Sequence, residues 1–272
     1  MSSASERFFV AAARVCAVAV VAIAPLVFLV LLASATAALA RGIHFAWDTF
    51  SMLAAATVAL GLVGATLGTA LGVGAALYVV EIAAPSTRQT IKALVGALHA
   101  VPAVGYGIVA AGVILLTPLL PNPLVTFAIA AIVLSIMIAS VVFVQMRRAL
   151  RALPDHLREV AGAAGADPVN VAVRAVLPAA QRSIAGIWWS AFALALGEAT
   201  ALAMVFSAAQ AKSVAASAVV LPGTLASILL QVGAMGRSTE SLGLAPAALV
   251  LFAMTIASVI LGRRAVGHVP WP

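Results

Sequence analysis

The sequence predicts an all-α integral membrane protein of about six transmembrane helices, with one long polar loop on the cytoplasmic side. Two observations carry this prediction: 64% of the 272 residues are hydrophobic, and only 8% are charged. A soluble domain has about 25% charged residues, so most of the surface of this chain must face lipid. The composition excludes an ordinary soluble enzyme and a disordered chain. A disulfide scaffold is excluded as well, because Cys16 is the single cysteine.

Six apolar segments are long enough to cross a hydrocarbon core of about 30 Å, which takes about 20 helical residues. The predicted spans are Val15–Leu39, Met52–Val80, Ile91–Leu116, Leu124–Met146, Ser183–Phe206 and Ala245–Leu261. A cleavable signal peptide is an alternative for the first span, since Arg7 precedes it. Its apolar run is longer than the roughly 7–15 residues of a signal peptide, which favours a retained span.

The basic residues indicate the orientation of the chain in the membrane. With a cytoplasmic N-terminus and six crossings, all of the 15 Lys and Arg residues except Arg41, Lys212 and Arg237 fall on the cytoplasmic side. Such an excess is typical of cytoplasmic loops, so both termini are expected in the cytoplasm. The net charge of +7 therefore indicates membrane topology and not nucleic-acid binding, because the basic residues form no continuous patch.

Two units are expected along the chain. Residues 1–50 form an N-terminal transmembrane helix and an outer loop, and residues 51–272 form a core that contains a cytoplasmic loop over 147–182. The outer connection over 207–244 holds an apolar piece at 214–230 that Pro222 and Gly223 interrupt. This piece is predicted to be a re-entrant or interfacial element.

Three glycines of the second span, Gly64, Gly68 and Gly72, follow one another at intervals of four residues. Residues at this spacing share one helix face, where missing side chains let another helix approach closely. The stripe is therefore interpreted as a helix-packing face. The glycines form no phosphate-binding loop, because the pattern G-x-x-x-x-G-K-[ST] is absent from the sequence.

The cytoplasmic loop has the signals of two short helices. Asp155 is expected to cap the first helix, and Gly165 to end it with a positive φ. Asp167 and Pro168 are expected to start the second helix, which Pro178 ends. Two short helices joined at a glycine form a compact knob that suits docking to a soluble partner. An ordinary connector with caps explains the spacing equally well.

The same loop resembles the E-A-A…G…L-P signature of ABC-importer permeases of the binding-protein-dependent type I. Glu159-x-Ala161-x-x-x-Gly165 is followed after eleven residues by Leu177-Pro178, although Val160 and Ala175 depart from the family pattern. In that family the loop forms coupling helices, which sit in a groove of a cytoplasmic ATPase. The resemblance implies an ATPase contact at Asp155, Glu159, Ala161, Gly165, Leu177 and Pro178.

Further segments are similar to the phosphate-importer permeases. These are Tyr78-Val-Val-Glu81, Val101-Pro102-Ala-Val-Gly-Tyr106-Gly107, Leu196-Gly197-Glu198-Ala-Thr200 and the stretch Ala247–Phe252. The resemblance implies import of an oxyanion, most of all phosphate, across a bacterial inner membrane. Molybdate, sulfate or another small solute is the alternative, because the Gly-Glu element is also close to their permeases. The implied partners are a second permease, two ATPases that bind the ATP, and an extracytoplasmic binding protein; this chain itself binds no cofactor.

Glu198 lies within the fifth predicted span, where a charge costs about 2.5–3.5 kcal/mol unless it faces a cavity or a partner. It is therefore expected on the translocation pathway, either protonated or paired with a cation. Phosphate permeases have an arginine four residues earlier, where this chain has Leu194. The other expected pathway residues are Thr200, Ser190, Pro102 and Tyr106. Pro102 either breaks the third span or only kinks it.

Other classes of function have less support in the sequence. The histidines are too scattered for a metal site, and no arrangement of Ser, His and Asp indicates hydrolysis. A secondary carrier usually has an internal repeat and several intramembrane ionisable groups, whereas here Glu198 alone is central. We therefore expect a transport subunit and not an enzyme; a membrane scaffold without a transported substrate is a further alternative.

Overall fold

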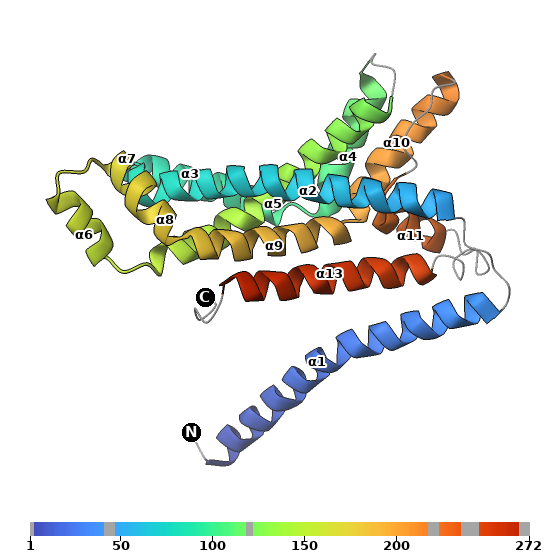
Figure 1. The fold of residues 1–272 in the computed structure, drawn as a ribbon, viewed down its shortest axis with the longest axis horizontal. Coiled ribbons are helices and arrows are strands. Elements are labelled where there is room, and N and C mark those ends of the chain that lie inside the picture. The colour runs from blue at the N-terminus through green and yellow to red at the C-terminus, as the bar shows by residue number, and fades with distance from the viewer. Residues whose placement is uncertain (1–2, 41–46, 118–121, 217–222, 235–244, 267–272) are drawn as a thin grey trace.

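The computed structural model is all-helical over the residues that it describes, which are 3–40, 47–117, 122–216, 223–234 and 245–266 (Figure 1). Four single helices are long and apolar enough to cross a membrane. They are α1 (Ser3–Ala40), α2 (Trp47–Leu77), α5 (Pro123–Arg151) and α13 (Ala245–Val266). The prediction of an all-α, multi-pass membrane protein is confirmed.

Two further pairs of helices are long and apolar enough to form a crossing together, and each pair is sharply bent at a short break. The first consists of α3 (Pro85–Ala100) and α4 (Ala103–Leu116), which meet at an angle of 88°. The second consists of α9 (Gln181–Gly197) and α10 (Thr200–Ala216), and its bend is 48°. Counted as one span each, they bring the number of crossings to six.

The remaining elements lie at the two ends of the molecule. A π-helical segment, η1 (Tyr78–Ile82), continues α2. Between α5 and α9 the chain forms four short elements: α6 (His156–Ala163), α7 (Pro168–Asn170), the π-helical η2 (Val171–Val176) and α8 (Leu177–Ala179). We call these four elements together the knob. α11 (Leu225–Ala234) lies toward the opposite end. Figure 1 shows that α1 begins and α13 ends on the side of the knob, as an even number of crossings requires.

The glycine stripe of α2 lies against a ridge of large side chains on α5. The facing pairs are Gly64 with Leu134, Gly68 with Ile138 and Gly72 with Val142. A Cβ added at any of these glycines would lie only 2.6–2.7 Å from the facing side chain. The periodic absence of side chains on α2 therefore lets the two helices pack at close range.

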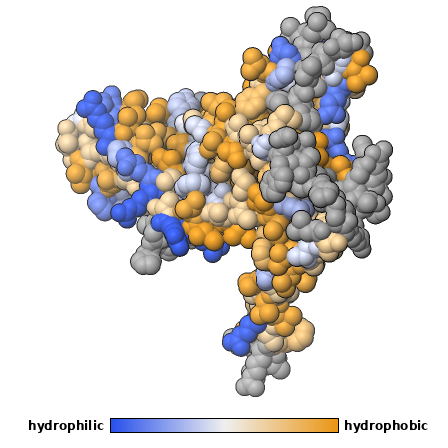
Figure 2. Space-filling model, turned by 45° about the vertical axis from the view of Figure 1, so that its right-hand side comes forward, coloured by the Kyte–Doolittle hydropathy of each residue, from blue (hydrophilic) through white to orange (hydrophobic). Residues whose placement is uncertain are grey.

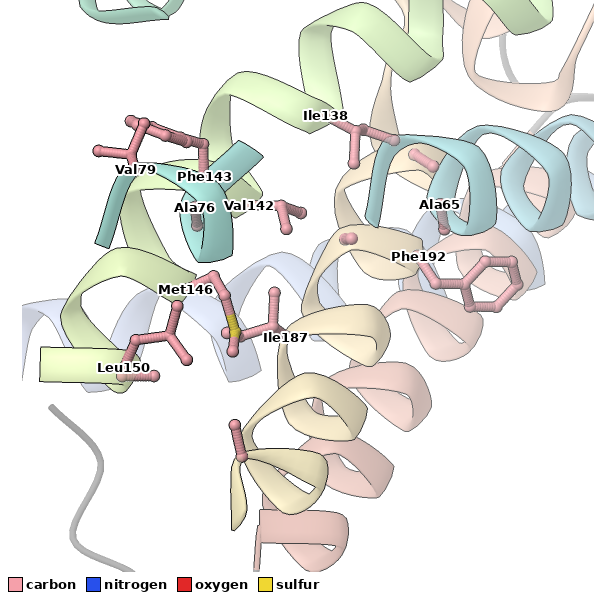
Figure 3. Packing of buried hydrophobic residues seen from close by; sticks show 14 of the residues in the cluster. Ala65, Ala76, Val79, Ile138, Val142, Phe143, Met146, Leu150, Ile187 and Phe192 are labelled. Carbon is pink, nitrogen blue, oxygen red and sulfur yellow. The ribbon is translucent and has the colours of Figure 1, made fainter. Parts of the chain in front are cut away.

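The largest hydrophobic cluster joins α2, α5 and α9 on the side of the molecule nearer the knob. Figure 3 shows Ala76 and Val79 of the α2–η1 segment facing Phe143 and Met146 of α5, with Ile187 of α9 nearby. All five residues are buried. Because α5 leads into the knob and α9 leads out of it, this cluster fixes the base on which the knob stands.

α1 stands apart from this bundle. Its second half packs against α13, with Ala35 and Ala38 buried and the rings of Phe28 and Phe252 6.3 Å apart. Its first half diverges from the body and exposes large apolar side chains such as Phe9, and Figure 2 shows this protruding surface as hydrophobic. Such a surface is suited to lipid.

The structure corrects the expected course of the fifth span and the outer connection. The helix breaks after Gly197 and then continues to Ala216, ten residues beyond the predicted end at Phe206. The reason is that α10 packs along α4 and brings Lys212 to the C-terminal end of α4. There Lys212 Nζ donates to the carbonyl of Ile114, at 2.6 Å, and to that of Thr117. Of the predicted apolar piece at 214–230, residues 217–222 lie outside the described residues, and α11 begins at Leu225.

The predicted boundaries of the inner loop also differ from the structure. α5 extends to Arg151 and α9 begins at Gln181, so helices take up both ends of the expected 147–182 loop. The boundary expected at residue 50 falls in the first turn of α2, which begins at Trp47.

Candidate translocation pathway and coupling loop

A cavity of about 170 Å³ lies where the two broken crossings meet α5. Its walls include His99, Val101 and Tyr106 from the first break, Met137 and Ser140 from α5, and Leu194 and Glu198 from the end of α9. The remaining lining residues are apolar. Glu198 contributes the only carboxylate, and no lysine or arginine is among the described residues that line this cavity.

Pro102 shapes the first wall of the cavity. A proline disfavours helical backbone in the residue before it, and both Val101 (ψ 124°) and Pro102 (ψ 151°) are extended. The crossing is therefore broken and not merely kinked. Tyr106 spans the break, because its hydroxyl donates to the carbonyl of Leu98 at 2.7 Å. The Leu98 carbonyl also accepts from the Val101 amide at 3.2 Å, so the end of α3 is held by one backbone and one side-chain donor.

Glu198 forms the second break without a proline. α9 ends at Gly197, Glu198 adopts an extended backbone (ψ 110°), and its Oε1 accepts a hydrogen bond from the Ala201 amide at 3.0 Å. The carboxylate thus caps the start of α10, where free N–H groups and the helix dipole favour negative charge. The expectation was protonation or a cation partner; in the structure a backbone donor is the partner of this intramembrane acid.

The halves that follow the two breaks, α4 and α10, run side by side (Figure 1). Gly107 permits their close approach, because a Cβ at this position would lie 2.7 Å from Met204 Sδ and 3.1 Å from Ala201 Cα. The cavity is therefore bordered by two broken helices that are tightly packed to each other beyond it.

The structure brings together only part of the predicted pathway set. Glu198 and Tyr106 line the cavity, and Pro102 adjoins its wall at Val101. Ser190 donates to the carbonyl of Gly186 within α9 at 3.1 Å, and neither it nor Thr200 is on the wall. The predictions omitted His99, Met137 and Ser140. For His99 a signal existed, since it lies three residues before Pro102.

Within the knob, Gly165 and Asp167 define the turn between the helices. Gly165 has a φ of +83°, and the Ala166 amide donates back to Ala161 at 3.1 Å, which closes the C-terminus of α6. Asp167 Oδ1 accepts from the Asn170 amide at 2.7 Å and thereby caps α7. A helical course then runs to Ala179, one residue beyond Pro178.

The prediction that Asp155 caps α6 is wrong. An N-cap residue needs an extended backbone for its side chain to reach the helix N–H groups, whereas Asp155 is already helical, with φ −66° and ψ −31°. Its Oδ1 instead accepts from Arg158 Nη1 at 3.3 Å.

The predicted ATPase-contact residues do not share one surface. Asp155, Glu159, Gly165 and Pro178 are exposed. Ala161 is turned inward and packs against the main hydrophobic cluster, and Leu177 is half-buried. The large apolar side chains that the knob exposes are Val160 on α6, Val169 on α7 and Val173 on η2.

An ion pair that joins the knob to the spanning body was missed by the sequence analysis. Arg158 Nη2 lies 2.9 Å from Glu81 Oε1, and Arg158 Nε donates to both oxygens of the same carboxylate. The Glu81 side chain is only 6% exposed. The hydrogen bond with Glu81 raises the pKa of Arg158 above its ordinary value, and a guanidinium is in any case always charged in proteins. No local signal connects two residues 77 positions apart.

Comparison with known proteins gives a likeness of fold. The sequence matches no family model, and no curated protein is significantly similar to it. A crystal structure of an amino acid ABC transporter with histidines has a chain that aligns with a TM-score of 0.54 and 15% identity, over 82% of this chain and 94% of that one. A chain of the inward-facing MetNI methionine ABC transporter aligns with a TM-score of 0.50 and 20% identity, over 80% and 93%. The chain has the fold of these transporter chains.

Proposed function

We propose that this protein is the transmembrane permease subunit of an ATP-driven ABC importer. The observation that carries the proposal is the knob, which presents Glu159 and Gly165 of the coupling signature at one end of a membrane-spanning bundle. The bundle has the fold of ABC transporter chains over four-fifths of its length. Because the sequence contains no Walker motif, the ATP belongs on partner subunits.

The proposed mechanism uses both sites. Two ATPases bind the knobs of two permease subunits on the cytoplasmic side of a bacterial inner membrane, with both termini of this chain on that side. ATP drives alternation only if it stabilises the outward-facing state more than the inward-facing one. Closure of the ATPases then moves the knob, and the cavity between the broken helices opens to the other side, where a binding protein delivers the solute.

Phosphate is the first candidate substrate, on the basis of the sequence segments that resemble phosphate permeases. Its negative charge finds no lysine or arginine among the described lining residues, and Leu194 lines the cavity where those permeases have arginine. An oxyanion would therefore need donors from the second permease. An amino acid is the second candidate, because the Glu198 carboxylate suits an ammonium group and both compared transporters are named for amino acids.

The test is solute uptake by proteoliposomes that contain this chain with the ATPase and binding protein encoded beside it. We expect the ATPase to co-purify with this chain. Uptake should require ATP on the side of the membrane that the knob faces. A panel of phosphate, molybdate, sulfate and methionine separates the substrate candidates. Uptake that follows a proton gradient without ATP would show a secondary carrier, and no uptake of any solute by an assembled complex would favour a scaffold.

A further inference from the structure

The guanidinium of Arg158 ties three separate parts of the chain together. Arg158 belongs to α6, and it binds the Glu81 carboxylate of η1 through Nε and Nη2. The same guanidinium donates to the carbonyl of Leu150, at the end of α5, at 2.8 Å and to that of Leu153 at 3.3 Å. One side chain therefore fixes the coupling helix α6 both to the connection between α5 and α6 and to the end of α2.

This contact is the ionic link between the knob and the bundle. Among the described residues, Arg158 forms ion pairs with Glu81 and with Asp155. Asp155 directly precedes α6, so only the pair with Glu81 reaches the bundle. The Asp155 side chain is 90% exposed, whereas those of Arg158 and Glu81 are 23% and 6% exposed. A paired, shielded carboxylate interacts more strongly than a solvated one, and the fork of Arg fixes its orientation.

The segment that Arg158 holds is a local irregularity of α2. In η1 the Ala83 amide donates to Tyr78 O, five residues back, and α7 and η2 of the knob lie against this turn. Val79 of η1 and Val176 of η2 are both fully buried in the main cluster. π-helical turns interrupt the regular hydrogen-bond ladder of an α-helix and are frequent at functional sites. A displacement of α6 would thus reach α2 at a point where its hydrogen-bond register is already altered.

We propose that the Arg158–Glu81 pair is the positioning link that transmits movement of the coupling helix α6 to the bundle. The inference rests on the proposed function, since it needs an ATPase that moves the knob. Neither residue lines the cavity, so both act through position and not through contact with the solute. The bidentate geometry resists both translation and rotation of α6 relative to η1, and a single flexible ammonium would not.

The experiment compares two conservative variants in the assembled transporter. Arg158→Lys keeps the charge but loses the fork, and Glu81→Gln keeps the shape but loses the charge. Both are expected to co-purify the ATPase and to hydrolyse ATP, while solute imported per ATP hydrolysed falls at least about fivefold, as for an allosteric coupling of ordinary size. The matched control is Arg148→Lys, at an exposed arginine of α5, and it should keep the wild-type ratio.

The double variant Arg158→Lys with Glu81→Gln gives an independent readout. If the two residues act as one unit, the double variant imports as much solute per ATP as the more impaired single variant. If their roles are independent, the two losses multiply. Multiplying losses, or an unchanged import per ATP in assembled single variants, would overturn the inference. So would failure of both single variants to bind the ATPase, because the pair would then serve assembly. A wild-type complex without ATP-dependent uptake would refute the proposed function instead.

Discussion

The two broken crossings interrupt their helices by different means. At the first break, Pro102 enforces an extended backbone, and the Tyr106 hydroxyl adds one hydrogen bond across the 88° bend. At the second, no proline is present, and the Glu198 carboxylate caps the new helix across a bend of 48°. The first break is imposed by covalent geometry, and the second depends on one polar contact. We therefore expect the second to be the more sensitive to substitution of a single polar side chain.

The largest effect is expected where the two crossings come together again, at Gly107. Gly107→Val would place a Cβ 3.1 Å from the backbone of Ala201, and overpacking of this kind costs about 1–3 kcal/mol. Thermal unfolding of the purified protein in detergent measures the loss. The control is Gly112→Val on the same helix, where an added Cβ meets no atom within 4 Å. Equal midpoints for the two variants would contradict the close packing of α4 on α10.

The second effect concerns the polar break itself. Glu198→Ala removes the cap of α10 and should lower the free energy of unfolding by about 0.5–2 kcal/mol, with loss of solute uptake. Glu198→Gln retains an acceptor oxygen and should preserve most of the stability. Uptake by the glutamine variant then shows whether transport needs the negative charge. An alanine variant as stable as wild type would mean that the contact with Ala201 does not hold the break.

The smallest effect is expected at the proline break. Tyr106→Phe removes one hydrogen bond, which contributes about 1 kcal/mol or less, because the Leu98 carbonyl keeps the Val101 amide as a donor. The bend itself should persist, because Pro102 remains. Detergent unfolding of this variant beside Glu198→Ala compares the two breaks directly. A larger loss for Tyr106→Phe than for Glu198→Ala would reverse the comparison.

The same contrast explains what the sequence could predict. The break at Pro102 and the positive φ of Gly165 follow from the backbone limits of proline and glycine, which act locally. The break at Glu198 has a weaker local signal, because Gly197 only lowers the helix propensity, glutamate is a good helix former, and its cap depends on the fold. Likewise, the Arg158–Glu81 pair joins residues far apart in the chain. The predicted Asp155 cap is wrong because the chain is already helical there.

The cavity and the knob were each predictable from the sequence only in part. The sequence segments around Tyr106 and Glu198 pointed to two walls of the cavity, because each contains an unusual residue inside an apolar span. The α5 wall, with Met137 and Ser140, has no distinguishing pattern and is known only from the packing of helices. In the knob, turns were predictable from single residues, but the inward orientation of Ala161 required the hydrophobic cluster beneath it.

Docking of an ATPase on the knob is the central claim, and site-specific photo-cross-linking tests it most directly. A photoreactive amino acid replaces Val160, which is 67% exposed on α6, or in the control Leu124, which is 80% exposed at the opposite end of α5. In the transporter assembled in vesicles, position 160 should give a covalent product with the ATPase subunit, identified by mass spectrometry, and position 124 should give none. No ATPase product from position 160 in a complex that transports solute, or equal products from both positions, would contradict the account.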